Sequence, residues 1–312
     1  MEVRLSDEVE RARASGAPIV VLESSVIAQG LPHPVNLEAA RVCEEAVRQA
    51  GAVPAVVAVV DGVVRCGLSG EEVRRLASGG ERRWKVGVGE LASAVLQKAT
   101  GGTTVSATCA VAAACGLPVF ATGGIGGVHR GEGGDVSADL GALARYPGMV
   151  VCAGAKSVLD LPRTLEALEA LGVPVLGYGT SEFPAFYADS SGLRLEHRAD
   201  TPELAAEALQ AQRDRLGLPQ AIVLAVPPPI EVALKRDEVD RALLTAEAEA
   251  RRQGVSGKEV TPFLLARLVE ATGGRTLRAN VALLSMNARV AGEVAVAYAK
   301  LTSGPSGRRA TS

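Results

Sequence analysis

The sequence has few cysteines, and their spacing excludes one class of site. Five occur among 312 residues, and none forms the CxxC pair that is typical of structural zinc sites. They are Cys43, Cys66, Cys109, Cys115 and Cys152, and most of them fall in apolar runs. We therefore expect reduced, buried thiols and no structural zinc site.

The sequence also has little net charge and no long apolar segment. A formal net charge of −2 argues against a nucleic-acid-binding surface. No apolar run approaches the ~20 residues that span a bilayer. The charged first stretch, MEVRLSDEVERARASG, lacks the apolar core of a signal peptide, so we expect a cytoplasmic protein. A hydrophobic content of 47% is ordinary for a globular enzyme.

Lysine is scarce as well, with six against 27 arginines. One of them, Lys156, follows the apolar run Met149 to Ala153, whose β-branched residues are typical of a buried parallel strand. The residues Asp160 to Pro162 then predict the start of a helix, with proline in its first turn. Lys156 is therefore predicted just past the carboxyl end of a central strand, where open α/β sheets bind ligands.

The position of Lys156 leaves two interpretations open. In a partly desolvated pocket, its amine would lose a proton near neutral pH and attack a carbonyl carbon. Its neighbours Ala153, Gly154, Ala155 and Ser157 are small enough to admit a ligand. The alternative is a solvated lysine on a surface loop. Arginine stays charged and does not form an imine, so lysine is the residue type that imine chemistry needs.

Strand and helix patterns alternate through the whole sequence. Pro18 to Glu23 reads as a buried strand that ends on a carboxylate, which places Glu23 at the same sheet edge. Asn36 and Asn280 are each predicted to cap a helix. The alternation predicts a three-layer α/β/α fold with a largely parallel central sheet, in a single catalytic domain over residues 1–302. The tail over residues 303–312 is predicted to be disordered.

Two glycine-rich stretches are candidates for ligand binding. In GGTTVSATCAVAAACG, two glycines and two threonines (Thr104 is the second) are predicted to open an alanine-rich helix, and such a terminus suits phosphate. A capped core helix explains this stretch equally well. It is neither a Walker A loop, because no Gly-Lys-Ser/Thr follows, nor a dinucleotide fingerprint.

The second stretch, from Thr122 to Leu140, contains His129 and ends with two acidic residues. Asp135 and Asp139 flank Ser137, which is a plausible helix N-cap. Paired acids and hydroxyls beside a phosphate can hold Mg²⁺ or Mn²⁺. Loop and cap chemistry is the alternative explanation of these residues.

A series of motifs in a fixed order resembles one known family. It comprises LESSVIAQGLPHPVNLE, GGTTVSAT, VFATGGIGGVHRG, DVSADL, VCAGAKSVLDLPRTLE, VPVLGYGTSEFPAFY, SGKEVTPFLLAR and RANVALLSMNARVA. They run from about Val21 to Glu293 and resemble the pseudouridine-5'-phosphate glycosidase family, also labelled indigoidine synthase A-like. The resemblance implies a homotrimer with an α/β/α core and one divalent ion, usually Mn²⁺, per subunit. It also implies the interconversion of pseudouridine 5'-phosphate and water with uracil and ribose 5-phosphate.

The resemblance further implies a role for particular residues. Lys156 matches the family's nucleophile, Glu23 its proton donor and Asp135 its metal ligand. The residues that match its substrate contacts are Lys85, Thr104, Val105, His129, Ser137, Ala138, Asp139 and Asn280. Among these, Lys85 matches a phosphate contact and Asn280 a contact to the base.

The implied reaction breaks a carbon–carbon bond, which explains the need for an amine. Ordinary glycosidases use two carboxylates and a leaving oxygen or nitrogen, whereas here the leaving atom is a ring carbon. An imine between Lys156 and C1' of a ring-opened ribose would provide the electron sink, with Glu23 moving the protons.

Two alternative functions remain open. A ribokinase-like sugar kinase would need a C-terminal GAGD-like segment, which the sequence lacks. In a non-catalytic sugar-phosphate-binding module, Lys156 would be only an anion contact.

Overall fold

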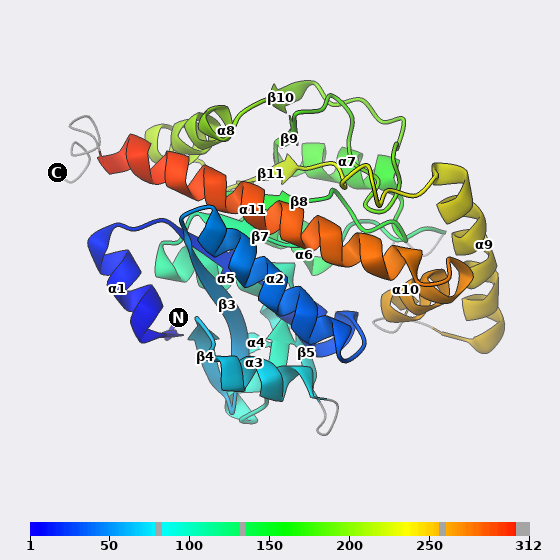
Figure 1. The fold of residues 1–312 in the computed structure, drawn as a ribbon, viewed down its shortest axis with the longest axis horizontal. Helices are drawn as coiled ribbons and strands as arrows, with labels where there is room; N and C mark the ends of the chain where they lie inside the picture. Colours follow the sequence, from blue (N-terminus) through cyan, green and yellow to red (C-terminus); the bar gives the residue numbers. More distant parts are fainter. Residues whose placement is uncertain (79–82, 132–134, 256–259, 304–312) are drawn as a thin grey trace.

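The computed structural model describes residues 1–78, 83–131, 135–255 and 260–303 (Figure 1). The tail predicted over residues 303–312 lies outside this part of the chain, apart from Ser303, which ends the last helix. The prediction that it is disordered therefore remains a prediction, as does the assignment of a single domain.

One mixed sheet forms the centre of the molecule. Its strands follow the order β1-β4-β3-β2-β7-β8-β11-β9-β10, and β6 pairs with both β3 and β5 beside this row. Among the described strands, only the pairs β3–β4 and β3–β6 are antiparallel. The strands are β1 Arg4–Leu5, β2 Ile19–Leu22, β3 Val53–Val60, β4 Val63–Cys66, β5 Trp84–Val86, β6 Gly101–Thr103, β7 Val119–Ala121, β8 Gly148–Cys152, β9 Val175–Tyr178, β10 His197–Ala199 and β11 Ala221–Ala225.

Helices cover both faces of this sheet. Helices α2 and α11 lie in front of it in Figure 1, and α5 and α6 lie behind it. This arrangement confirms the predicted three-layer fold with a largely parallel sheet. The helices are α1 Asp7–Ser15, α2 Val35–Gln49, α3 Gly70–Ala77, α4 Leu91–Leu96, α5 Val105–Cys115, α6 Ala138–Leu143, α7 Leu161–Ala170, α8 Pro202–Leu209, α9 Arg236–Gln253, α10 Val260–Ala271 and α11 Arg275–Ser303, with the short turns η1 Val26–Gly30, η2 Val88–Glu90 and η3 Gln210–Arg215.

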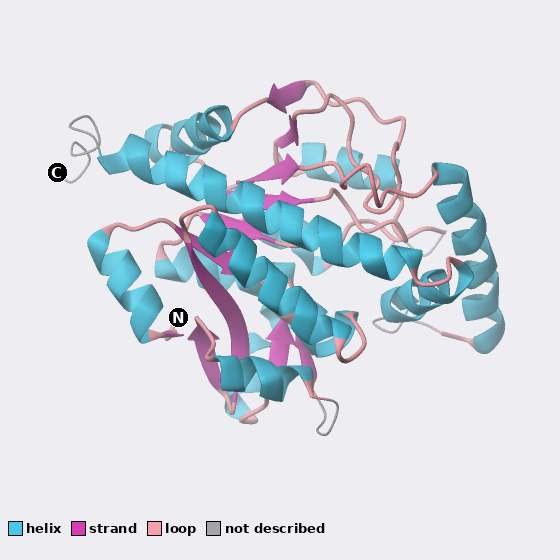
Figure 2. Ribbon diagram, viewed as in Figure 1, coloured by secondary structure: helices cyan, strands magenta, loops and turns pink. Residues whose placement is uncertain are grey.

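The sheet's central strands are those that the sequence predicts most clearly. β2, β7 and β8 are short and apolar, and all their residues except Gly148 at the start of β8 are buried, as expected of strands covered by helices on both faces. β7 pairs in parallel with both β2 and β8, so the three strands end at one edge. Glu23, Thr122 and Lys156 follow these three ends. Helices α9 and α10 pack together beyond this edge, on the right of Figure 2.

The predicted helix caps at Asn36 and Asn280 are wrong. Helix α2 begins at Val35, and buried Asn36 donates from Nδ2 to the carbonyls of Ile27 (2.9 Å) and Ala77 (3.0 Å). Helix α11 begins at Arg275, which leaves Asn280 inside the helix. In both cases an asparagine serves a tertiary contact, which a local capping rule does not detect.

The prediction that the paired glycines begin helix α5 is wrong. Gly101 to Thr103 form β6, and the helix starts at Val105 after Thr104.

None of the helices in the described part of the chain combines the length and the apolar character that crossing a membrane requires.

Candidate active site

Two adjoining cavities open at the carboxyl edge of the sheet. The larger has a volume of about 480 Å³ and the smaller of about 340 Å³. Ser25, Lys85, Lys156 and Thr261 line both, so the two form one site with two lobes. The larger lobe is mostly apolar, and much of one wall comes from α10. The smaller lobe is lined largely by polar and acidic residues from the second glycine-rich stretch.

Lys156 lies where the two lobes meet. Its backbone N–H donates to the carbonyl of Ile125 (3.1 Å), which ties the residue to the glycine-rich stretch. The residue is partly buried, and within the described ranges no hydrogen bond or ion pair engages its Nζ. The amine is therefore free of competing protein partners there and can reach a ligand from either lobe.

A glycine two residues before Lys156 makes the approach possible. Gly154 has a φ of +77°, and a Cβ there would lie 2.3 Å from the carbonyl oxygen of Pro184. Any side chain would clash with that backbone and would also strain the turn. Gly154 therefore fixes the path by which the chain leaves β8 and reaches Lys156.

Glu23 is a buried carboxylate with two hydroxyl partners. Ser25 donates to its Oε2 and Thr122 donates to its Oε1. The carbonyl of Thr122 accepts a hydrogen bond from Asn287 Nδ2 (2.8 Å) on α11. Glu23 is only 6% exposed, so this network holds the carboxylate in one place on the wall of the larger lobe.

The carboxylate of Asp139 ties two structural elements together. Its Oδ1 accepts from the backbone N–H of Ser106 (2.9 Å), and its Oδ2 accepts from that of Gly126 (2.8 Å). Ser137 caps α6 by accepting from the N–H of Asp139 (3.2 Å), as the sequence predicts. Asp139 thus fixes the start of α5 against the glycine-rich stretch and shapes the smaller lobe.

Two acidic residues of the smaller lobe, Asp135 and Asp139, are predicted site residues. Asp135 is the more exposed of the two. Its side chain is 63% exposed, and its Oδ2 lies 3.9 Å from His129 Nε2. Among the described residues, no group of three or more histidines, cysteines and acids could hold a metal ion. An ion bound by Asp135 would therefore need water and substrate oxygens as its other ligands, which suits Mg²⁺ or Mn²⁺.

Asn280 and Tyr187 form a polar pair on the wall of the larger lobe. Asn280 Nδ2 donates to Tyr187 Oη (3.0 Å), and both side chains are buried. Burial raises the pKa of the Tyr187 phenol, while the hydrogen bond from Asn280 opposes this. The phenol is therefore neutral at working pH and can hold the amide in one orientation.

The structure brings nearly all the predicted site residues together. Val105 is the exception, since it is buried in the first turn of α5 and lines neither lobe. The residues that line the site are Glu23, Lys85, Thr104, His129, Asp135, Ser137, Ala138, Asp139, Lys156 and Asn280. This shared location supports their predicted roles without testing them.

Sequence reasoning missed several residues that support this site. Ser25 stands two residues from Glu23, so its hydroxyl could have been noticed as a local partner. Thr122 is 99 residues from Glu23, and Asn287 is 165 residues from Thr122. No local pattern reports contacts over such separations, because they depend on strand order and helix placement.

Comparisons with known proteins find relatives that match nearly the whole chain. A model of the family described as "Indigoidine synthase A like protein" matches residues 8–297. A pseudouridine-5'-phosphate glycosidase of Myxococcus xanthus is 57% identical and covers 96% of this chain and 99% of its own. One of Chloroflexus aurantiacus is 50% identical, with coverage of 96% and 99%.

Solved structures show the same fold. The prealnumycin C-glycosynthase AlnA, crystallised in complex with ribulose 5-phosphate, has a TM-score of 0.88 at 36% identity, covering 96% of this chain and 98% of its own. An indigoidine synthase A-like protein of Thermotoga maritima has a TM-score of 0.86 at 37% identity, with coverage of 94% and 95%.

Proposed function

The chain belongs to the family of indigoidine synthase A like proteins, and on this premise we propose that it reversibly cleaves pseudouridine 5'-phosphate to uracil and ribose 5-phosphate. The observation that carries the proposal is the placement of Lys156 and Glu23 on the wall of one cavity. An amine and a carboxylate are the two groups that this reaction needs. Relatives with 57% and 50% identity bear the name of this activity.

The two lobes suit the two parts of the substrate. The smaller lobe offers the hydroxyl of Thr104 near the start of α5, and with Lys85 it suits the phosphate. The larger lobe offers apolar walls and the amide of Asn280, which suit the uracil ring. The ribose would then span the junction of the lobes, where Lys156 lies.

The proposed reaction proceeds through an imine. The bond from C1' to the ribose ring oxygen breaks, Lys156 Nζ bonds to C1', and Glu23 supplies the proton that the ring oxygen takes up. The proton that Nζ loses on bonding to C1' passes to the Glu23 carboxylate, which delivers it to uracil C5, and the C1'–C5 bond breaks with its electron pair passing into the uracil ring. The nitrogen lone pair forms the C1'=N bond as uracil leaves. Water hydrolyses this imine, which releases ribose 5-phosphate and restores the amine.

A divalent ion belongs to this proposal as well. Asp135 would hold Mn²⁺, and when bound the ion would supply positive charge for ordering water and phosphate oxygens. The exposed carboxylate of Asp135 fits such a site, because carboxylate and water are ligands that Mn²⁺ accepts. The homotrimer and the cytoplasmic location are also proposals. The first follows from the family resemblance, and the second follows from the sequence.

Trapping separates this proposal from the sugar kinase and from the binding module. Borohydride should reduce an imine between wild-type protein and ribose 5-phosphate, raising the mass of the peptide that contains Lys156. Lys156→Arg should lose both trapping and uracil release, because guanidinium does not form the imine. Lys300→Arg, an exposed change at the end of α11, is the matched control and should keep both. Substantial uracil release by Lys156→Arg would overturn the mechanism.

A further inference from the structure

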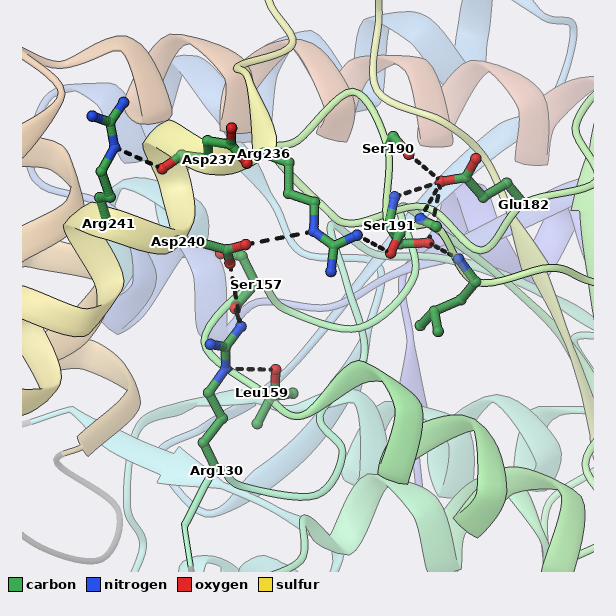
Figure 3. Close-up of polar contacts among 12 residues, drawn as sticks. Arg130, Ser157, Leu159, Glu182, Ser190, Ser191, Arg236, Asp237, Asp240 and Arg241 are labelled. Atoms are coloured by element: carbon green, nitrogen blue, oxygen red, sulfur yellow. Dashed lines mark hydrogen bonds and ion pairs between the residues drawn. The ribbon is translucent and has the colours of Figure 1, made fainter.

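One arginine side chain holds the turn that carries Lys156. Arg130 donates from Nε to the carbonyl of Leu159 (3.1 Å) and from Nη2 to that of Ser157 (3.4 Å). Figure 3 shows the guanidinium of Arg130 below Ser157 and beside Leu159. In the described part of the chain, no other side chain donates a hydrogen bond to the backbone of residues 156–159, and the next carbonyl, that of Asp160, accepts from the hydroxyl of Thr164 (2.7 Å).

Backbone hydrogen bonds fix the two ends of this turn, and a further one from Leu159 N–H to Lys156 O (3.0 Å) closes it. Lys156 N–H donates to Ile125 O (3.1 Å), and Asp160 N–H donates to Val128 O (2.9 Å). The hydroxyl of Ser157, in the middle of the turn, is buried and has no hydrogen-bond partner in the described residues. Among the described residues, the carbonyls of Ser157 and Leu159 accept no backbone hydrogen bond, so the two hydrogen bonds from Arg130 hold these parts of the turn.

Helix α9 in turn orients Arg130. Asp240 Oδ1 lies 3.7 Å from its Nη2, and Glu247 Oε1 lies 3.9 Å from its Nε. Asp240 also lies 3.5 Å from Arg236 Nε, so two guanidinium groups converge on one carboxylate, as Figure 3 shows. These pairs are long and partly exposed, so they contribute little to stability but bias the direction of the guanidinium.

We infer that Arg130 is a positioning residue for Lys156. By holding the carbonyls of Ser157 and Leu159, it fixes the turn and so the direction in which Nζ enters the site. An arginine suits this task because its planar fork presents two N–H groups at a fixed separation, whereas lysine presents a single point of charge. The inference rests on the proposed function, since it assigns Arg130 to the imine-forming step.

This role predicts a particular kinetic signature. The phosphate contacts at Thr104 and Lys85 do not involve the turn, so substrate affinity should be preserved. The attack of Nζ on C1' should slow, because a misplacement of about 1 Å can lower a rate by about 100-fold. A merely structural arginine would instead lower the melting temperature and leave the kinetics of the folded protein unchanged.

The experiment measures borohydride trapping of ribose 5-phosphate on Lys156, together with kcat and KM for uracil release. Arg130→Lys should slow trapping and lower kcat by about 10- to 100-fold with KM nearly unchanged. Arg198→Lys is the matched control, because it alters an arginine that pairs with Asp200 at the protein surface. It should leave trapping, kcat and KM as in the wild type.

A second variant guards against loss of folding. Asp240→Asn removes a carboxylate that orients Arg130 without touching the turn, and it should lower kcat by a smaller factor, about 3- to 10-fold. Wild-type rates of trapping in both Arg130→Lys and Asp240→Asn would overturn the positioning role while leaving the proposed function intact. A raised KM with unchanged kcat would also overturn it, because it would indicate a direct substrate contact. Absence of trapping and of uracil release in the wild type would overturn both.

Discussion

Thr122 donates its hydroxyl hydrogen to Glu23 and so joins the ends of two adjacent parallel strands. Its partner carboxylate is buried, and Ser25 occupies the other oxygen. The position of the proposed proton donor therefore depends on a residue that no local sequence pattern connects to it.

Replacing Thr122 tests this dependence. Thr122→Val keeps the shape but removes the hydroxyl, and we expect kcat to fall by about 10- to 100-fold with little change in KM, because proton transfer needs a fixed donor. The loss of a partner for a buried carboxylate should also lower the free energy of unfolding by about 1–3 kcal/mol. Thr122→Ser keeps the hydroxyl and should stay within a few-fold of wild type. Equal kcat values for the two variants, measured by uracil release, would contradict this account.

The phosphate of the substrate should contribute to the rate as well as to binding. Pseudouridine without phosphate should react with a kcat/KM lower by about 100-fold or more, because remote binding energy supports the chemical step. Lys85→Gln should reduce kcat/KM for the phosphorylated substrate and leave that for the nucleoside nearly unchanged. Steady-state kinetics with both substrates give the comparison. A similar loss for the two substrates would mean that Lys85 does not serve the phosphate.

Asp135 and Asp139 should respond differently to the same substitution. Asp135→Asn should weaken the dependence of activity on Mn²⁺ and leave the melting temperature unchanged, because its carboxylate is largely exposed. Asp139→Asn replaces an acceptor of two backbone N–H groups with an amide and should lower the melting temperature. Titration of activity with Mn²⁺, together with thermal unfolding, distinguishes the two. Unaltered Mn²⁺ dependence in Asp135→Asn would move the ion elsewhere.

Tyr187 should tune the binding of the uracil ring through Asn280. In Tyr187→Phe the amide of Asn280 loses its partner, and we expect KM for pseudouridine 5'-phosphate to rise by about 3- to 10-fold, the usual value of one hydrogen bond. The control is Tyr298→Phe. It removes a hydroxyl that donates to the side chain of Asp214, and Asp214 does not line the site. An unchanged KM in Tyr187→Phe would show that the pair does not contact the base.

The central sheet and the place of Lys156, the proposed nucleophile, were predictable because their signals are local. Strand β8 is a short run of apolar residues, and Lys156 stands a few positions after it, so the parallel-sheet rule places the amine at the carboxyl edge. Glu23 follows β2 in the same manner. In each case the apolar run of one short segment was enough to place the residue that follows it at the carboxyl edge of the sheet.

The supporting contacts were not predictable because they depend on tertiary placement. The interpretation of Asn36 and Asn280 as caps used a statistical preference at helix starts. In the structure both side chains are buried and form hydrogen bonds with other elements. Arg130 appeared only as one member of a glycine-rich stretch, and nothing in that stretch indicates the carbonyls of Ser157 and Leu159. Local sequence rules describe contacts within a turn, whereas these residues form contacts between elements that are distant in the sequence.

The two asparagines of α11 lie seven residues apart, close to two full turns of the helix, so they point in similar directions. Asn280 donates to Tyr187 and Asn287 donates to the carbonyl of Thr122, so one helix contacts both the proposed base pocket and the residue that holds the proposed acid. Inserting one residue between them would rotate one by about 100° relative to the other. A change in the length of the segment between Asn280 and Asn287 would therefore break the contact to Tyr187 or the contact to Thr122, whereas substitutions elsewhere on the helix would leave both in register.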